Sequence, residues 1–432
     1  MKKNINFVFF FALIVFSGCL VPKHTAITNS KGKLKGGSQF LFISDIHLNT
    51  LSDTTDYNLD TGTGLWKIFL TKVDSILGGA NAPSFAVYTG DLPGHYSCAS
   101  DCYLEPGSRE SHNRDLTTIL KGLRELFTRH HTPFFYVPGN NDALAGDYYS
   151  FADKQNMTPF SLVPDSMNPY PALNVNQTGN TAPCMVSNSH PTMGYYSARP
   201  VDGLRLIGLN TVMYSKNFIA VDGTNQTDDG NAQMEWLGTE LKDARDKGEK
   251  VLITMHIPPG NDAYKYGKNP ANASMWVRNT GPGVSWENRF LSLIDQYQNS
   301  VSGILYGHTH MDEIRRLYDS TGNQVTAVAI SCPGVTPQHN NNPGFKLVLF
   351  DKINKELIDF TTFYTLPSAV AWGNLTYSFN NQFGFPLGQS LYKNVRSSSL
   401  SDLSRKMSRI YTVMHGQVKY DIAPGIEVKY GQ

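Results

Sequence analysis

The 432-residue chain has little charge and no bulk excess of either sign, which excludes several classes of protein. Charged residues make up 17% of it and the formal net charge is +1, so no overall field favours nucleic acid or an acidic membrane. Glycine, tyrosine and phenylalanine are plentiful, which is typical of a loop-rich globular protein and not of a disordered one. No repeat period is present. The length allows one large domain or two smaller ones.

Long apolar runs are also scarce, and the clearest one lies at the N-terminus. Lys2 and Lys3 precede ten apolar residues, Phe7 to Phe16, which are too few to span a bilayer but match a signal peptide over residues 1–19. The ending Phe-Ser-Gly-Cys resembles a bacterial lipobox that would lipidate Cys19, and the alternative is ordinary cleavage with release. We therefore expect an exported protein, either a bacterial cell-envelope lipoprotein or a secreted one, with membrane attachment only through that anchor. Residues 20–37 are predicted to be a flexible linker.

Cysteine is rare, with five in the chain and four after Cys19. An even number is typical of an exported protein with disulfides. Cys98 and Cys102 lie in a polar loop, where a local disulfide would brace the chain. A metal-binding pair is the alternative, but no second Cys or His pair completes a set. Five Asn-X-Ser/Thr sequons would matter only in a eukaryotic secretory pathway.

Short apolar runs typical of buried strands precede each cluster of polar motif residues. These runs are Phe40–Ile43, Phe85–Tyr88, Phe134–Val137, Val251–Ile253 and Val301–Leu305. The candidate ligands thus follow the carboxyl ends of strands, where open α/β proteins build their sites.

Helices are predicted between these strands, and strands alone follow them. Leucines and other apolar residues recur at helical spacing over 116–127 and 234–244, while 325–330, 346–350 and 357–363 are consecutive strand-like runs. This order predicts an α/β protein with two sheets packed face to face and helices outside. Residues 365–432 carry no catalytic motif and are predicted to be a structural, partly helical appendage, with one amphipathic helix near 400–410.

Five motifs supply the residue types that a two-metal site needs. They are Asp45-Ile-His47, Gly90-Asp91, Gly139-Asn140-Asn141-Asp142, His256 and Gly307-His308-Thr309-His310. Two divalent cations about 3.5–4 Å apart need a bridging carboxylate and an inner shell of His, Asp and Asn. A lone Asp-X-His or Gly-Asp is weak, since both occur in ordinary turns. Gly-His-Thr-His is the strongest single motif, because two histidines two residues apart can reach neighbouring metals.

Taken together, the motifs resemble those of the calcineurin-like metallophosphoesterase superfamily, over residues 38–364. The resemblance implies a four-layer sandwich of two mixed β-sheets flanked by helices. It also implies a bridging role for Asp91. One metal would be held by Asp45, His47 and His310, and the other by Asn140, His256 and His308.

Further segments resemble the acid sphingomyelinase-like phosphodiesterases. Gly90-Asp91-Leu92-Pro93-Gly94-His95 matches their Gly-Asp-X-Pro-X-His pattern, and residues 209–211 and 335–345 are similar to segments of the same group. The resemblance implies a phosphodiesterase in which a hydroxide bridging two metals attacks phosphorus. It favours zinc, while the mixed imidazole and carboxylate ligands also suit manganese or iron.

One position departs from the superfamily pattern. Asn141 stands where most members have the histidine that protonates the leaving group, and an amide is no acid near neutral pH. The Gly-Asn-Asn-Asp form resembles that of endopolyphosphatases. We therefore hypothesise that His95 is the general acid, with a hydrogen-bonding role for His95 as the alternative. Asn141 is expected to hydrogen-bond a phosphate oxygen.

The substrate stays open at this level. Nucleotide-like or other small phosphodiesters come first, with sphingomyelin and polyphosphate as alternatives and no binding of duplex nucleic acid expected. Polyphosphate would prefer a basic groove, whereas Lys265, Arg315, Arg316 and Lys346 are scattered in sequence and expected at the solvated surface. Several loop tyrosines could stack on a base, although packing is the simpler expectation: Tyr96, Tyr148, Tyr149 and Tyr264.

A protein that binds its ligand without catalysis is the alternative from another class. It would be a metal-loaded binding lipoprotein on a phosphoesterase scaffold, and the loss of the usual histidine at Asn141 favours it. Retention of all seven ligand types argues against it, because clustered carboxylates are costly to keep without a metal.

Overall fold

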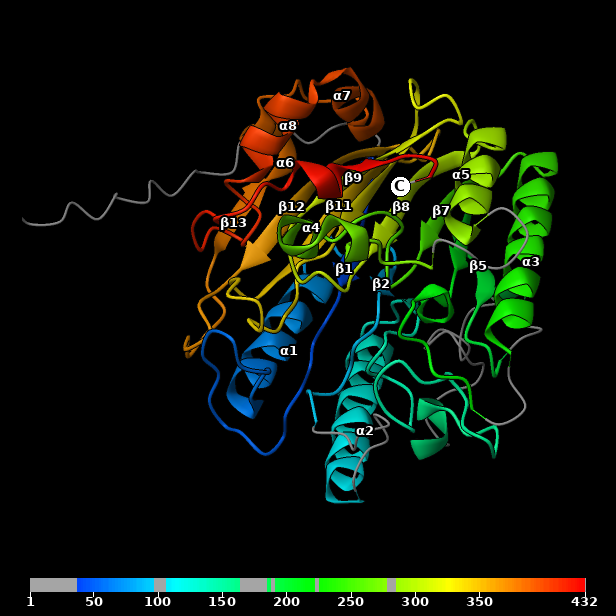
Figure 1. Cartoon of the computed structure of the whole chain (residues 1–432). Helices are drawn as coiled ribbons and strands as arrows, with labels where there is room; N and C mark the ends of the chain where they lie inside the picture. Colours follow the sequence, from blue (N-terminus) through cyan, green and yellow to red (C-terminus); the bar gives the residue numbers. More distant parts are fainter. Residues whose placement is uncertain are drawn as a thin grey trace, which may run out of the picture. The chain divides into compact units, whose positions relative to one another are not determined.

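Two β-sheets form the centre of the fold (Figure 1). They are seen in a computed structural model that describes residues 37–96, 106–163, 185–187, 191–221, 225–277 and 285–431. The predicted signal peptide, almost all of the linker, and Cys98, Cys102 and Cys184 lie outside the described residues. The disulfide and the lipid anchor therefore stay predictions. Cys332 is a buried free thiol.

The first sheet has six strands and is mixed. Its order is β13 (Leu375–Ser378), β12 (Leu357–Tyr364), β11 (Gly344–Asp351), β1 (Gly37–Ile43), β2 (Ala86–Tyr88) and β3 (Phe134–Tyr136). β1, β2 and β3 run parallel to one another, while β11, β12 and β13 continue the sheet in antiparallel pairs. The parallel strands are buried apolar runs, as expected for strands covered on both faces.

The second sheet has eight strands and is also mixed. Its order is β14 (Glu427–Val428), β9 (Ile314–Tyr318), β10 (Val325–Ser331), β8 (Val301–Tyr306), β7 (Lys250–Thr254), β6 (Leu204–Gly208), β5 (Tyr196–Val201) and β4 (Met185–Ser187). The central pairs β6–β7, β7–β8 and β8–β10 are parallel. Leu305 of β8 and Ile330 of β10 share a buried cluster with Phe42 of β1, so the two sheets pack face to face.

Helices cover the outer faces, which completes four layers and confirms the predicted α/β sandwich (Figure 1). α1 (Thr63–Leu77) and α2 (Pro106–Arg129) pack with the six-stranded sheet, and α3 (Gln226–Asp246) and α5 (Trp286–Gln296) pack on the eight-stranded sheet. α3 begins where the side chain of Asn225 accepts hydrogen bonds from Thr227 and Asp228. Within the described residues, every helix is too short or too polar to cross a bilayer.

Shorter helices lie in the connections and in the last part of the chain. They are η1 (Pro159–Leu162), η3 (Thr211–Tyr214), α4 (Ala263–Lys268), η4 (Pro270–Asn272), α6 (Phe379–Phe383), α7 (Leu391–Ser397), α8 (Leu400–Met407) and α9 (Ala423–Ile426). α8 occupies the predicted amphipathic stretch. β13 extends the first sheet, β14 pairs with β9 of the second, and α7 contacts strands of both. The chain after residue 364 is therefore built into the sandwich, while a domain boundary at that residue stays a prediction.

A buried ion pair joins the two sheets. Lys346 of β11 donates to Asp312, which precedes β9, at 2.7 Å, and both side chains are fully buried. Thr362 of β12 and Tyr377 of β13 donate to the other carboxylate oxygen at 2.8 and 2.6 Å. Lys346 also donates to the carbonyl of Ser331 in β10 at 2.7 Å. Each polar atom of the pair thus has a partner from the facing sheet or its own.

This arrangement corrects the expectation that several cations lie at the solvated surface. Arg315 and Lys346 are completely buried and Arg316 is 5% exposed. Arg315 donates to the carbonyls of Pro259 and Asn261, and Arg316 pairs with Glu427 at 2.6 Å. Arg315 also pairs with the buried Glu313 at 3.2 Å. The other partners are carbonyls and carboxylates far away in sequence, so composition near each cation gave little sign of burial.

We expect Asp312→Asn to lower the free energy of unfolding by about 3 kcal/mol or more, because it leaves the Lys346 ammonium buried without a counter-charge. Urea denaturation followed by circular dichroism measures the change. The matched control is Asp246→Asn, which breaks the exposed pair between Lys242 and Asp246 and should change stability little. Equal, small effects of the two substitutions would contradict the linking role of the buried pair.

Candidate metal centre

The seven candidate ligands all follow the carboxyl ends of strands. Asp45 and His47 follow β1, Asp91 follows β2 and Asn140 follows β3, while His256 follows β7 and His308 and His310 follow β8. Three loops thus come from one sheet and two from the other. Because the sheets pack face to face, these strand ends meet at one edge of the sandwich.

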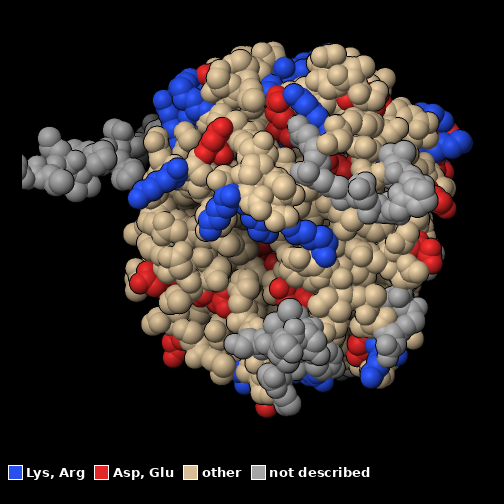
Figure 2. Space-filling model, viewed as in Figure 1, with Lys and Arg blue, Asp and Glu red and all other residues tan. Residues whose placement is uncertain are grey.

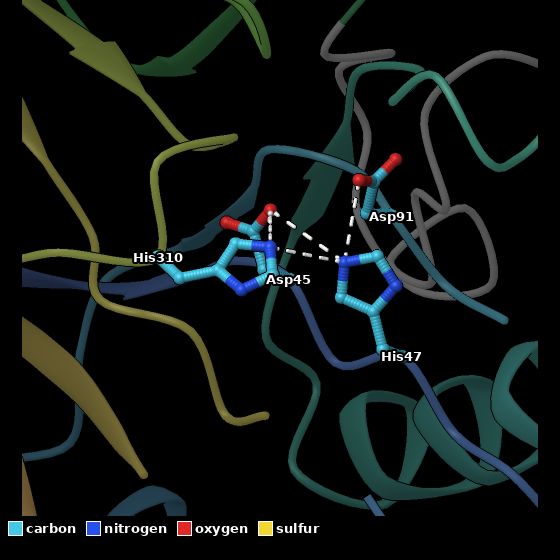
Figure 3. A group of neighbouring side chains, drawn as sticks. All are labelled: Asp45, His47, Asp91 and His310. Carbon is cyan, nitrogen blue, oxygen red and sulfur yellow. Dashed lines mark hydrogen bonds and ion pairs between the residues drawn. The ribbon is translucent and has the colours of Figure 1, made fainter. Parts of the chain in front are cut away.

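The first group of ligands contains Asp45, His47, Asp91 and His310, all buried (Figure 3). The Nε2 atom of His310 lies 3.3 Å from Oδ1 of Asp45 and 3.2 Å from Nε2 of His47. Nε2 of His47 lies 3.3 Å from Oδ2 of Asp91. Four side chains from three loops therefore point their donor atoms into one small volume.

The second group contains Asn140, His256 and His308 and shares Asp91 with the first. Nε2 of His256 lies 3.2 Å from Oδ2 of Asp91. Oδ1 of Asn140 lies 3.0 Å from Nε2 of His256 and 2.9 Å from Nδ1 of His308. One carboxylate thus lies between two sets of donors, which is the arrangement of a dinuclear site.

Backbone carbonyls fix the orientation of two of the imidazoles. Nδ1 of His47 contacts the carbonyl of Pro93 at 3.0 Å, and Nδ1 of His256 contacts that of Thr89 at 2.6 Å. A ring N–H that donates to a carbonyl leaves the lone pair of the other nitrogen for a metal. Both Nε2 atoms therefore face the shared carboxylate of Asp91 as acceptors of a cation.

The ligand loops adopt strained backbone conformations. Five ligands have φ between 44° and 71°, a region that costs a residue other than glycine on the order of 1–3 kcal/mol. They are Asp45, His47, Asp91, His308 and His310. Such strain persists only where the surroundings over-determine the conformation, and it clusters at functional sites.

Asp142 is one of the groups that hold these loops. Its buried carboxylate accepts hydrogen bonds from the backbone N–H groups of Asp91, Leu92 and Gly139 at 3.1, 2.6 and 2.6 Å. Tyr136 donates to it at 2.7 Å. The fourth residue of Gly-Asn-Asn-Asp therefore ties the loop after β2 to the loop after β3.

The glycine of that motif is required by close packing. A Cβ atom on Gly139 would lie 2.2 Å from Oδ1 of Asp91. Any side chain there would displace the shared carboxylate, so the motif needs glycine at this position.

Electrostatics favour the protonation state that metal binding needs at His308, His310 and Asp91, and oppose it at His47 and His256. Burial lowers the pKa of His308 and of His310 well below the usual range, so both rings are neutral. Burial opposes ionisation of Asp91, but the charge and hydrogen bond of His256 and those of His47 hold its pKa well below normal. Burial likewise opposes protonation of His47 and His256, yet Asp91 raises the pKa of each to about 9. A metal that binds there must displace these protons.

The donor set fits divalent metal ions. Four imidazoles, two carboxylates and one amide oxygen lie together in two groups that share Asp91, and all are buried except His308, which is half-buried. Clustered carboxylates and imidazoles of this kind suit transition-metal cations, whereas calcium and magnesium prefer sites built of oxygen. The Nδ1 atom of His310 is buried and has no hydrogen-bond partner among the residues that the structure describes, which leaves its ring without a carbonyl anchor there.

The two residues predicted to act in catalysis lie beside this centre. His95 is about 40% exposed, its Nδ1 lies 2.7 Å from Oδ1 of Asp60, and its ring stacks on His47 with centroids 4.2 Å apart. Asn141 donates from its side chain to Oδ2 of Asp91 at 3.1 Å and from its backbone to Oδ1 at 2.9 Å. Their catalytic roles stay predictions.

Three acidic residues near the site were missed at the level of sequence. Asp142 belongs to the Gly-Asn-Asn-Asp motif but was given no role, because its backbone partners in the loop after β2 are not visible in the sequence. Asp60 and Asp147 stand in loops with no motif around them, so only proximity reveals them. The segment 209–211 contacts α3 and the loop of His256. Gln233 of α3 exchanges hydrogen bonds with the backbone of Asn210, and Thr211 accepts from the backbone N–H of Ile257, next to His256.

A cleft of about 750 Å³ opens over the candidate ligands. Asp91, Asn140, His308 and His310 lie on its floor side, and His95 lines it as well. Of the four loop tyrosines, Tyr148 and Tyr264 line the cleft, while Tyr149 is buried and Tyr96 donates to Asp115. The volume suits a small organic phosphate.

A double-sheet sandwich with this buried Asp/His cluster at the meeting strand ends defines a metallophosphoesterase. More specifically, the chain belongs to the calcineurin-like phosphoesterase family, whose model matches residues 38–312. The predicted family is confirmed.

Individual relatives indicate the branch of this family to which the chain is similar. The chain is 27% identical to a sphingomyelin phosphodiesterase of Bos taurus, over 73% of this chain and 48% of that protein. It is 26% identical to a sphingomyelinase phosphodiesterase D of Dictyostelium discoideum, over 82% and 77%. It is 27% identical to the cyclic GMP-AMP phosphodiesterase SMPDL3A of Mus musculus, over 69% and 61%. These relatives confirm the acid sphingomyelinase-like branch, and the chain spans about half the length of the Bos taurus protein.

Among solved structures, a 5'-nucleotidase from Candida albicans SC5314 has a TM-score of 0.35 at 12% identity, over 72% of this chain and 46% of that one. This structural similarity is too low to support a conclusion about function.

The orientation of Asn140 depends on Asp147. The amide of Asn140 donates from Nδ2 to Oδ1 of Asp147 at 2.7 Å, which turns its Oδ1 toward His256 and His308. Without an acceptor at residue 147 the amide could rotate and present N–H groups to the metal position.

We expect Asp147→Leu to weaken metal binding by about 10–100-fold, as loss of a partner that orients a ligand typically does. Isothermal titration of metal-depleted protein with zinc measures the affinity of each site. Asp147→Asn is the matched control, because its amide oxygen can still accept from Asn140, and it should retain most of the affinity. Unchanged metal binding by the Leu variant would show that Asn140 needs no such partner.

Proposed function

We propose that this protein is a metal-dependent phosphodiesterase. The observation that carries the proposal is the carboxylate of Asp91, which lines a substrate-sized cleft and is shared by two groups of largely buried ligands. Asp45, His47 and His310 would hold one cation, Asn140, His256 and His308 the other. Two bound divalent cations would supply an activated water as nucleophile and withdraw charge from the phosphate oxygens.

We propose zinc as the resident metal, with manganese or iron as alternatives. Four of the seven donors are imidazoles, which favours these metals over magnesium. The neutral state of His308 and His310, which burial favours by lowering the pKa of both rings, supports the same choice.

In this proposal, His95 donates a proton to the leaving group and Asn141 contacts the phosphate. His95 lines the cleft beside the first ligand group, and Asp60 engages its Nδ1. Nε2 then remains for the oxygen of the leaving group, to which His95 would give a proton. Asn141 is held by Asp91 in this structure, so contact with a phosphate oxygen would require it to exchange that partner.

We expect His95→Ala to reduce kcat/KM for phosphodiesters with alkoxide leaving groups by about 10²–10⁴-fold, the usual range for a general acid. Hydrolysis of p-nitrophenyl esters should be largely spared, because p-nitrophenolate leaves without a proton. Steady-state kinetics on both substrate types gives the comparison. Equal losses on the two would remove His95 from the acid role and favour a purely hydrogen-bonding one.

Among substrates we propose nucleotide-like or other small phosphodiesters first. Relatives named as sphingomyelin phosphodiesterases and as a cyclic GMP-AMP phosphodiesterase support a phosphodiester. Sphingomyelin and polyphosphate are the alternatives, and a panel of ATP, cyclic dinucleotides, sphingomyelin and polyphosphate distinguishes them. We also propose export, on the strength of the signal-like residues 1–19.

We expect the purified protein to hydrolyse bis-p-nitrophenyl phosphate, to lose this activity on chelation, and to regain it with zinc. Asp91→Asn should abolish activity and lower metal content, because it removes the charge that both cations share. Release of p-nitrophenolate and elemental analysis are the measurements. A wild-type protein that carries two metals per chain yet turns over none of the panel would favour the non-catalytic binding lipoprotein.

A further inference from the structure

One wall of the cleft is built from two segments far apart in sequence. Tyr264 and Lys265 come from α4, and Lys419 and Tyr420 come from the segment 411–420 near the end of the chain. The rings of Tyr264 and Tyr420 meet edge to face with centroids 5.5 Å apart. Figure 2 shows Lys and Arg side chains gathered along the rim of the central hollow, on the side of α4.

The ammonium groups of the two lysines in this wall are exposed and are not neutralised by a close ion pair with the described residues. Lys265 is about half exposed, and its Nζ lies 3.6 Å from Oδ2 of Asp262, which is a loose ion pair. Lys419 is exposed and forms no ion pair with the described residues. Lys265 lines the same cleft as His308 of the second ligand group.

The segment that carries Lys419 is held in place by its surroundings. Val413 and Met414 have φ of 55° and 65°, which a β-branched residue such as valine rarely adopts. Asn342 donates to the carbonyl of Val413 at 2.8 Å, and its backbone N–H donates to that of Thr412 at 3.1 Å. Because these contacts fix the strained conformation, the cleft wall is preorganised before substrate binds.

The same segment is anchored to two other segments of the chain, one of which contains the cleft residue Asn340. Nδ1 of His415 contacts the carbonyl of Asn340 at 2.7 Å, and its ring stacks on Tyr57 with centroids 3.8 Å apart. The chain after the family match at residue 312 therefore supplies a fixed part of the cleft, not a free tail.

We infer that Lys265 and Lys419 form a second anion subsite, which binds a phosphate of the substrate other than the one that is cleaved. This inference rests on the proposed function and narrows its substrate class to phosphodiesters or phosphoanhydrides with at least two phosphates. Two cations on a cleft wall attract a polyphosphate chain and repel a cationic head group such as choline. The tyrosines beside them offer ring faces and edges to whatever organic group the phosphates carry.

The test compares substrates that differ only in phosphate number. For the metal-loaded wild-type protein, kcat/KM should rise along dinucleoside polyphosphates with two, three and four phosphates, and the rise should shrink with added salt. In Lys265→Ala/Lys419→Ala, the ratio of kcat/KM for the tetraphosphate to that for bis-p-nitrophenyl phosphate should fall roughly five- to tenfold, the size expected for two half-exposed charge contacts.

Lys268→Ala is the matched control. Lys268 lies on the same helix, but its Nζ sits over the ring of Tyr264, 4.0 Å from the centroid, and it does not line the cleft. This variant should keep the wild-type ratio. A double variant that keeps the wild-type dependence on phosphate number overturns the second subsite.

A binding measurement separates this result from failure of the proposed function. Calorimetry with a methylene-bridged analogue of ATP, on metal-loaded protein, needs no turnover. Roughly five- to tenfold weaker binding by the double variant, with unchanged binding by Lys268→Ala, supports the subsite even if no hydrolysis is found. Equal affinity of all three proteins overturns it even if bis-p-nitrophenyl phosphate is hydrolysed.

Discussion

The structure depends on keeping one carboxylate, that of Asp91, at the meeting point of two sheets. Its Oδ2 atom contacts both His47 and His256, and the backbone N–H of Asn141 donates to its Oδ1. Burying a carboxylate in this way is costly unless charges and hydrogen bonds compensate for lost water. The two sets of imidazoles, and in the proposed enzyme the cations they hold, provide that compensation.

The fold supplies the precision that such a site requires. Strand ends deliver the ligands, but the final placement depends on left-handed backbone at five of them and on the carboxylate of Asp142 that accepts from two loops. Gly139 permits the closest approach of these loops. Backbone strain is thus located where the chemistry is proposed to occur. The stability of the surrounding sandwich, whose two sheets are joined by Lys346 and Asp312, offsets the free-energy cost of this strain.

The last part of the chain has two structural roles that a survey of motifs does not reveal. β13 and β14 extend the two sheets, and residues 411–420 form part of the cleft wall. If that wall selects a second phosphate, the catalytic centre and the specificity of the enzyme come from different regions: the centre from the loops common to the family, and the selection from a later segment with few recognisable features.

The sequence by itself determined eight of the strands, the helices α2, α3 and α8, the fold class and the seven candidate ligands, because apolar runs of set period and short Gly, Asp and His motifs are local signals. It did not identify α1, α5, β5, β6 or β9. It did not determine that Arg315 and Lys346 are buried, since most of their partners lie on segments far away in sequence. Nor did it reveal the contact of Asp60 with His95, the hydrogen bond from Asn140 to Asp147, or the fact that Lys265 and Lys419 line one cleft. Those relations arise only when distant segments pack together, because charge pairing and hydrogen bonding act through space and leave no periodic pattern along the chain.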